Sequence, residues 1–226
     1  MAHVVGVDGW KSGWIAVVVD ASDGAVDGVI GFSSFREPPA PVADASIVVV
    51  DIPIGLPLSG RRQADSAARR FVGPRASSVF PTLPRAPLEA PTYQDALALS
   101  RRLFGFGISA QSYALRSKIL ELAEVTETDR RITEGHPETS FTAINGSPLQ
   151  YSKKVWNGIT ERRRLLAEAG IHLADDLPPE VGSAPPDDVI DAAVMAWTAL
   201  RVDAGSARCL PDPPEIIGGR EVAIWY

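Results

Sequence analysis

The sequence is poor in the residues that build disulfides and thiolate metal sites. Of its 226 residues, one is a cysteine and three are histidines. A single thiol excludes an internal disulfide and any multi-cysteine metal site. Cys209 is therefore expected to be a partly buried, unpaired thiol.

Long apolar runs and a surplus of basic charge are also missing. The longest apolar stretches, such as residues 14–19 and 47–50, are far shorter than the roughly 20 residues that a membrane span needs. The first ten residues show neither a basic leader nor an apolar run with a cleavage site. These features predict a cytoplasmic protein with no membrane partner. The net charge of −6 excludes a general basic surface that coats nucleic acid, but not an enzyme that contacts phosphates locally.

The first fifty residues have the pattern of β-strands. HVVGVDG, WIAVVVD and VDGVIGF are short β-branched runs separated by turn-rich segments, which predicts an antiparallel three-stranded meander. After a proline-rich connection, IVVVDIP is a continuous apolar run, typical of a strand buried on both faces in a parallel sheet. A central strand is therefore expected to end at Asp51.

The rest of the chain is mostly helical in pattern. Residues from about 54 to 130 are predicted to form a helical and loop insertion within a single domain, 1–226, because no change of composition isolates them. RITEGHPETSFTAI predicts another strand, kinked at Pro137, and a helix is expected from about Asp187 to Ala204 before a short terminal strand, EVAIWY. This order indicates a mixed α/β fold, with antiparallel strands beside parallel ones and helices flanking the sheet.

Acidic residues follow two of the predicted core strands. Asp8 comes directly after VVGV and Asp51 directly after IVVV. Open α/β sheets place their ligand sites at the carboxyl ends of strands. A turn or helix-capping role would explain one such aspartate. Two of them on core strands favour paired, protonated or metal-bound carboxylates.

The segment PDDVIDAAVMAW places further acidic residues on a predicted helix, where they too can be structural or functional. Asp187 or Asp188 can cap the helix start, where a negative charge suits the helix dipole. Asp191 lies one turn further in, on the same face as Asp188, and capping does not explain it. The alanines that follow Asp191 would let the helix pack closely on a sheet.

Two further acids, Glu134 and Glu138, would share one face of the predicted strand at residues 131–144 if that strand is regular. Acids at the end of an exposed strand are common, and that is the alternative to a functional role.

If Asp8, Asp51, Asp188 and Asp191 converge, they cannot all ionise at neutral pH without a cation. Oxygen ligands with little cysteine or histidine favour Mg²⁺ or Mn²⁺ over zinc. Such a site suits phosphoryl transfer with two metal ions about 3.5 to 4 Å apart.

Several long phrases also carry a family resemblance that runs nearly end to end. They are VGVDGWKSGW, VVVDIPIGLP, SSVFPTLPR, GISAQSYAL, EGHPETSF, INGSPLQYSKK and PDDVIDAAVMAW. In this order they resemble domain-of-unknown-function family 429, whose members are regarded as predicted nucleases of the ribonuclease H-like superfamily. The resemblance implies a ribonuclease H-like sheet and metal-dependent hydrolysis of phosphodiester bonds in a nucleic acid substrate.

More remotely, the chain is similar to the RuvC-type resolvases, which carry an Asp on the first strand, an acid on the fourth and D-x-x-D-A on the last helix. By this similarity Asp8 is the first-strand ligand and Asp51 the fourth-strand acid, which is Glu in the resolvases. Asp188 and Asp191 are the helix pair. Glu138 belongs to the family's own phrase and is implied to be an extra catalytic residue or a residue behind the ligands.

Other polar residues in these phrases are candidate contacts for phosphates or base edges. They are Arg75, Ser77, Ser78, Arg85, Gln111 and Lys118, for which bracing of the helical lobe is an equal alternative, and Lys153 and Lys154. Residues 162–164, three consecutive arginines, have instead the spacing of a solvated helix face. Trp10, Trp14 and Trp156 are predicted to be packing residues.

Two other classes of function are compatible with parts of this pattern. A ribonuclease H-like protein could bind or sense a nucleic acid or nucleotide without cutting it; loss of Asp8, Asp51 or Asp191 would favour that alternative, and all three are present. An actin-like or sugar-kinase-type ATPase also begins with an aspartate at a strand end. It would need a second glycine-rich phosphate turn and a longer chain, which this sequence lacks.

Overall fold

The computed structural model describes residues 2–11 and 13–226 and contains a mixed five-stranded sheet in the order β3-β2-β1-β4-β5. Its strands are β1 (His3–Trp10), β2 (Gly13–Asp20), β3 (Val26–Phe32), β4 (Ile47–Val50) and β5 (Ile132–Glu134). The first three strands pair antiparallel, whereas β4 pairs parallel with both β1 and β5. The predicted meander and the predicted mixed α/β class are both confirmed.

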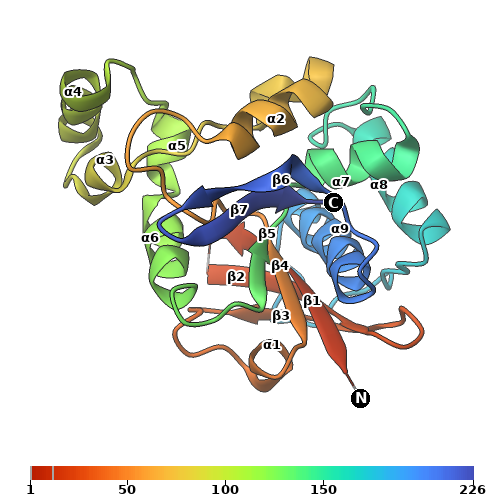
Figure 1. Cartoon of the computed structure of the whole chain (residues 1–226). Helices are drawn as coiled ribbons and strands as arrows, with labels where there is room; N and C mark the ends of the chain where they lie inside the picture. The colour runs from red at the N-terminus through yellow and green to blue at the C-terminus, as the bar shows by residue number, and fades with distance from the viewer. Residues whose placement is uncertain (1, 12) are drawn as a thin grey trace.

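Helices cover both faces of this sheet (Figure 1). One face carries α7 (Pro137–Asn145), α8 (Trp156–Glu168) and α9 (Pro186–Asp203), and the other carries α3 (Arg85–Glu89), α4 (Tyr93–Phe104), α5 (Ala110–Ala114) and α6 (Arg116–Val125). The strands alternate between two cores: Val5 and Val7 pack with the α3–α6 side, and Val4 and Val49 pack with α9. Among the described residues, no helix is long and apolar enough to cross a membrane.

Close packing of α9 on β1 depends on small residues. A Cβ added at Gly6 would lie 1.9 Å from the backbone nitrogen of Ala196 and 2.2 Å from the carbonyl oxygen of Ala192. Only glycine therefore fits at this crossing. The prediction that alanines let this helix approach the sheet is correct, and Gly6 supplies the other half of the contact.

The remaining elements are α1 (Ala40–Ala43), α2 (Gln63–Phe71), the 3₁₀ helix η1 (Gly73–Ser78), and a hairpin of β6 (Cys209–Ile217) and β7 (Arg220–Trp225). The hairpin packs on α2 through Val222 and Ile224. The terminal strand predicted from EVAIWY is β7. β6 was not predicted, because its sequence, CLPDPPEII, contains three prolines, which cannot donate to a ladder. Cys209 is free and buried.

Residues 131–144 do not form the single strand predicted from the sequence. The strand ends at Glu134, and α7 begins at Pro137. Proline is tolerated in the first turn of a helix, because the N–H groups there make no hydrogen bond within the helix. Glu134 and Glu138 therefore lie on different elements and do not share a strand face. Glu138 is in the first turn of α7, where its charge suits the helix dipole.

Candidate metal centre

Two of the predicted ligands leave neighbouring strands at the same edge of the sheet. Val7 of β1 is in register with Val50 of β4, and the Asp51 N–H donates to the Val7 carbonyl at 3.0 Å. Asp8 and Asp51 thus follow paired residues of two parallel strands; β4 ends at Val50, whereas β1 continues past Asp8 to Trp10. Asp8 is two residues after Gly6, so strand alternation directs it to the face that α9 covers.

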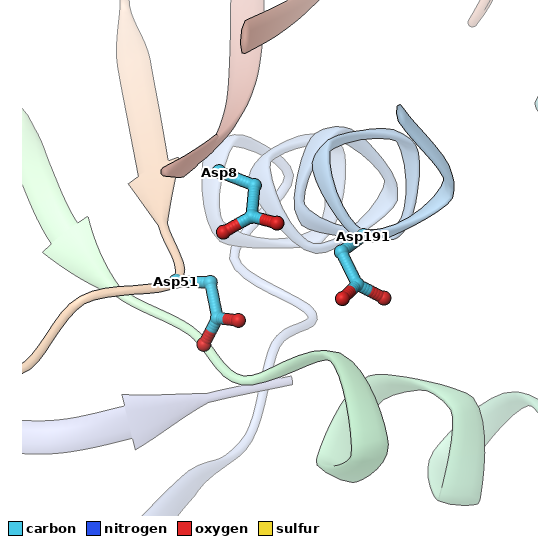
Figure 2. Close-up of side chains that lie close together, drawn as sticks. All are labelled: Asp8, Asp51 and Asp191. Atoms are coloured by element: carbon cyan, nitrogen blue, oxygen red, sulfur yellow. The ribbon is translucent and has the colours of Figure 1, made fainter. Parts of the chain in front are cut away.

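The third carboxylate comes from α9. Ligand oxygens of Asp8, Asp51 and Asp191 all lie within 4.8 Å of one another. Figure 2 shows the three side chains pointing toward a common space, from the end of β1, the end of β4 and the helix. Asp191 is fully buried, Asp8 is nearly so, and Asp51 is half-buried. We call these three residues the carboxylate centre.

The carboxylate centre is electrostatically unfavourable when fully ionised. Burial, and then the charges of Asp51 and Asp191, raise the pKa of Asp8 well above its usual range. Burial also raises the pKa of Asp51, although His136 and Lys153 oppose this. Burial raises the pKa of Asp191 to about 6 even though Lys153 lowers it. A bound cation would therefore stabilise the ionised form of all three acids.

The residues present fit a divalent cation with a preference for oxygen ligands. Within residues 2–11 and 13–226, the buried oxygens Asp191 Oδ1 and Glu138 Oε2 have no hydrogen-bond partner, so they are free to interact with an ion or its water shell. The ammonium of Lys153 contacts Asp191 Oδ2 and stands on the edge of the same space. Because the donors of this centre are all carboxylate oxygens, Mg²⁺ or Mn²⁺ suits it better than zinc. The identity of the metal stays a prediction.

Asp188, the fourth predicted ligand, is not one of the three converging acids. It is half-buried, and its charge adds to the rise in the pKa of Asp8, so it lies at the margin of the carboxylate centre. Burial, followed by the charge of Asp187, raises the pKa of Asp188. Neither aspartate caps α9, whose N-cap position is Pro185; Asp187 instead pairs with Lys154. The side-chain cap expected of Asp187 or Asp188 is therefore wrong, but both acids do lie in the first turn of α9, where a negative charge suits the helix dipole.

Glu138 is held by an arginine that was expected to face solvent. Arg162 is buried and donates to Glu138 Oε1 at 2.5 Å and to the Tyr151 carbonyl at 3.1 Å. It thereby ties α7 to the loop that carries Lys153. The solvated helix face predicted for residues 162–164 holds for Arg163 and Arg164, which form partly exposed ion pairs, and is wrong for Arg162.

A cavity of about 470 Å³ adjoins the carboxylate centre, with Asp51, Glu138 and Lys153 in its wall. Six of the predicted substrate contacts line it: Arg75, Ser77, Ser78, Gln111, Lys153 and Lys154. The structure shows a bracing role for two of these. The Arg75 guanidinium donates to the carbonyls of Leu149 and Gln150 at 3.0 and 2.7 Å, and the Ser78 hydroxyl donates to the carbonyl of Arg75.

Comparison with known protein families identifies the family of this chain. The family model described as "Protein of unknown function (DUF429)" matches residues 6–216. The chain belongs to the DUF429 family. The match spans all three acids of the carboxylate centre, so this centre is part of the family domain. No curated protein and no solved structure matches the chain.

Two predicted substrate contacts of the DUF429 protein, Arg85 and Lys118, do not line this cavity. Arg85 pairs with Glu89 at 3.4 Å and lines a different cavity. Lys118 donates to the Gly13 carbonyl, and its ammonium lies 4.2 Å from the centroid of the Trp14 ring. Trp14 is buried in the core, as predicted for a packing residue, but Trp156 is 80% exposed, so the packing role predicted for it is wrong.

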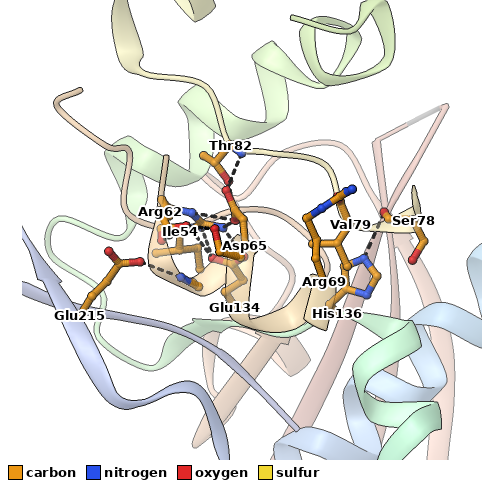
Figure 3. Close-up of polar contacts among 12 residues, drawn as sticks. Ile54, Arg62, Asp65, Arg69, Ser78, Val79, Thr82, Glu134, His136 and Glu215 are labelled. Carbon is orange, nitrogen blue, oxygen red and sulfur yellow. Dashed lines mark hydrogen bonds and ion pairs between the residues drawn. The ribbon is translucent and has the colours of Figure 1, made fainter. Parts of the chain in front are cut away.

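A second buried acidic cluster was missed from the sequence (Figure 3). The Arg62 guanidinium donates to Glu134 at 2.7 and 2.8 Å and to Asp65 at 2.5 and 3.0 Å. Asp65 also accepts the Thr82 N–H, and Glu134 accepts the Ile54 N–H. Glu134 is therefore a structural residue. The one local signal was the spacing of Arg62 and Asp65, three apart at a helix start; the partner Glu134 is 72 residues away.

Proposed function

We propose that this DUF429 protein is a metal-dependent nuclease of the ribonuclease H-like type. In this proposal Asp8, Asp51 and Asp191 hold Mg²⁺ or Mn²⁺, and the substrate is a nucleic acid. The observation that carries it is the convergence of three carboxylates, from two parallel strands and a helix, within 4.8 Å.

The architecture around the carboxylate centre supports the proposal. The sheet order β3-β2-β1-β4-β5, with an antiparallel meander followed by parallel strands, puts the first and fourth strands side by side. Asp8 lies near the end of the first, Asp51 follows the fourth, and Asp191 lies on the last helix. The RuvC-type resolvases have acids at these same three places.

The side chains around the carboxylate centre suit phosphodiester hydrolysis. When bound there, divalent ions would activate a water molecule and stabilise the leaving oxygen. Asp8, Asp51 and Asp191 would hold them, and Asp188 would add negative charge at the margin. Lys153 and Lys154 line the adjoining cavity and can bind the phosphates of the substrate. Glu138 Oε2 has no partner and can accept a hydrogen bond from the attacking water.

The test is a cleavage assay with single-stranded, duplex, hybrid and branched nucleic acids in Mn²⁺. We expect cleavage by the native protein, loss of cleavage in Asp8→Asn and no change in Asp176→Asn, which alters an exposed aspartate. Absence of metal-dependent cleavage above the Asp8→Asn background would refute the nuclease proposal.

One observation favours a second candidate, a protein that binds nucleic acid or a nucleotide without cutting it. The ammonium of Lys153 already contacts Asp191, so the chain itself neutralises part of the carboxylate centre. The same assay separates the two functions, because this candidate predicts binding of the substrates without cleavage in any divalent ion.

A further inference from the structure

The cavity beside the carboxylate centre has a wall that phosphodiester hydrolysis alone does not explain. Its residues come from both sides of the molecule: Lys153 and Glu138 belong to the α7–α8 side, and Gln111 and Ile119 belong to the α3–α6 side. Asp51 forms part of the same wall. A ligand in the cavity would therefore lie directly against one of the three metal-binding carboxylates.

Part of this wall is apolar and includes a phenylalanine ring. Phe80, Pro81, Leu115 and Ile119 line it, and Phe80 is 37% exposed. Flat aromatic faces stack on nucleobases of any sequence. Exposure of a phenylalanine ring inside a cavity is costly in water, and a stacked base would relieve that cost.

Polar groups that can recognise a base stand beside this apolar wall. In the described part of the chain, neither the Gln111 amide nor the Ser77 hydroxyl has an intramolecular hydrogen-bond partner, and both line the cavity. An amide offers donors and an acceptor together, as a base edge requires. Lys153 and Lys154 supply positive charge for a phosphate next to Asp51.

The size of the cavity limits what can enter. A volume of about 470 Å³ is within the range of small-molecule sites, roughly 300–1,000 Å³. One nucleotide fits such a space, whereas an intact duplex is too wide. Enzymes that must take a base into a pocket act on single strands or extrude the base, and the energetic cost is smallest for unpaired bases.

We propose that this cavity binds one unpaired nucleotide of the substrate strand, with its base stacked on Phe80 and hydrogen-bonded by Gln111, and its phosphate between Lys153 and the carboxylate centre. This proposal rests on the proposed nuclease function and narrows it. The substrate class is single-stranded nucleic acid, or the unpaired end of a duplex.

Equilibrium binding tests the proposal independently of cleavage. Hydrolysis-resistant phosphorothioate oligonucleotides, single-stranded, blunt duplex or duplex with an unpaired overhang, are titrated with the protein in Mg²⁺ and followed by fluorescence anisotropy. We expect the single strand and the overhang to bind at least about tenfold more tightly than the blunt duplex. Phe80→Ala should weaken single-strand binding by about tenfold, within the range for one stacked base.

Trp156→Ala is the matched control, because Trp156 is the more exposed aromatic residue and lies outside the cavity. It should leave the affinity unchanged. A second readout needs no variant: 2-aminopurine in the single strand should lose fluorescence on binding to the native protein, because its base becomes stacked.

Several results would overturn the proposal. They are equal affinity for blunt duplex and single strand, equal losses in Phe80→Ala and Trp156→Ala, unchanged 2-aminopurine fluorescence, or no single-strand binding. If the expected binding is found but Mn²⁺ produces no cleavage, the nucleotide site stands and the nuclease function fails. The two failures are thus distinguishable.

Discussion

Two buried acidic clusters lie at the same edge of the sheet, and they differ in how far a side chain of the protein neutralises their negative charge. Asp65 and Glu134 surround Arg62, whose guanidinium donates to both carboxylates. Oxygens of Asp8, Asp51 and Asp191 lie within 4.8 Å of one another, and among the described residues the cation in contact with them is the ammonium of Lys153, which binds Asp191 from the edge. The first cluster is complete within the chain, and the second is not.

The comparison shows how to separate a structural acid from a functional one. Strand alternation sends Glu134 into the core that contains Ile132 and Val50, where α2 provides an arginine beside it. Asp8 and Asp51 face α9, which provides only another acid. Burial raises the pKa of both kinds of acid. What distinguishes the two clusters is whether fixed positive charge accompanies the burial.

Removal of the internal cation from the first cluster should have the largest effect. Arg62→Met leaves Asp65 and Glu134 buried without a partner, and we expect a loss of about 3–5 kcal/mol in the free energy of unfolding. Urea denaturation measures it. Arg102→Met, at an exposed position of α4, should change the same quantity by less than about 0.5 kcal/mol. Equal stability of the two variants would show that the Arg62 cluster is not a structural support.

Neutralising one acid in each cluster should change stability in opposite directions. In metal-free buffer Glu134→Gln should destabilise the fold by about 1–3 kcal/mol, because charge-assisted bonds to Arg62 are lost. Asp8→Asn should leave stability unchanged or raise it, because it relieves repulsion. Mn²⁺ at a hundred times its dissociation constant should stabilise the native protein by about 2.7 kcal/mol and fail to stabilise Asp8→Asn. A strongly destabilised Asp8→Asn would contradict this.

The free energy of unfolding should depend on pH through the titration of Asp191 in the carboxylate centre. The pKa of Asp191 is about 6 in the fold, against about 3.9 for an unfolded aspartate. Between these values the folded state binds the additional proton. Without metal, the contribution of Asp191 therefore falls as pH rises from about 4 to about 6, by up to about 3 kcal/mol, and is constant above.

Urea denaturation in chelator across this pH range measures the effect, with Asp191→Asn as the control that cannot titrate. Native stability relative to Asp191→Asn should fall with rising pH. Stabilisation by Mn²⁺ should be weaker at pH 5 than at pH 7.5, because protons compete with the metal. A relative stability that rises over this window would contradict the assignment.

The smallest expected effect concerns Lys153. Its ammonium competes with a divalent ion for Asp191 Oδ2, so Lys153→Met should bind Mn²⁺ roughly tenfold more tightly, a difference of about 1.4 kcal/mol. Isothermal titration calorimetry measures the affinity. Lys154→Met is the control, because Lys154 pairs with Asp187, outside the carboxylate centre. Unchanged affinity in Lys153→Met would show that the lysine is no competitor.

The sequence was sufficient for features that local patterns encode. Alternating β-branched runs determine the meander, and a continuous apolar run determines the buried strand before Asp51. A carboxylate directly after such a strand must emerge at its carboxyl end, and a helix rich in alanine can pack closely. Asp8, Asp51 and Asp191 could therefore be predicted as neighbours without coordinates.

Only the tertiary structure decided which charges are neighbours across long separations. Arg62 with Glu134, and Arg162 with Glu138, are buried pairs whose arginines look like ordinary surface residues in sequence. Asp188 remains at the margin while Asp191 converges, and Trp156 is exposed although its type favours burial. The physical reason is that the spacing of residues in the sequence does not indicate which distant residue a long side chain will contact. Burial and backbone packing select that partner after the strands and helices have come together.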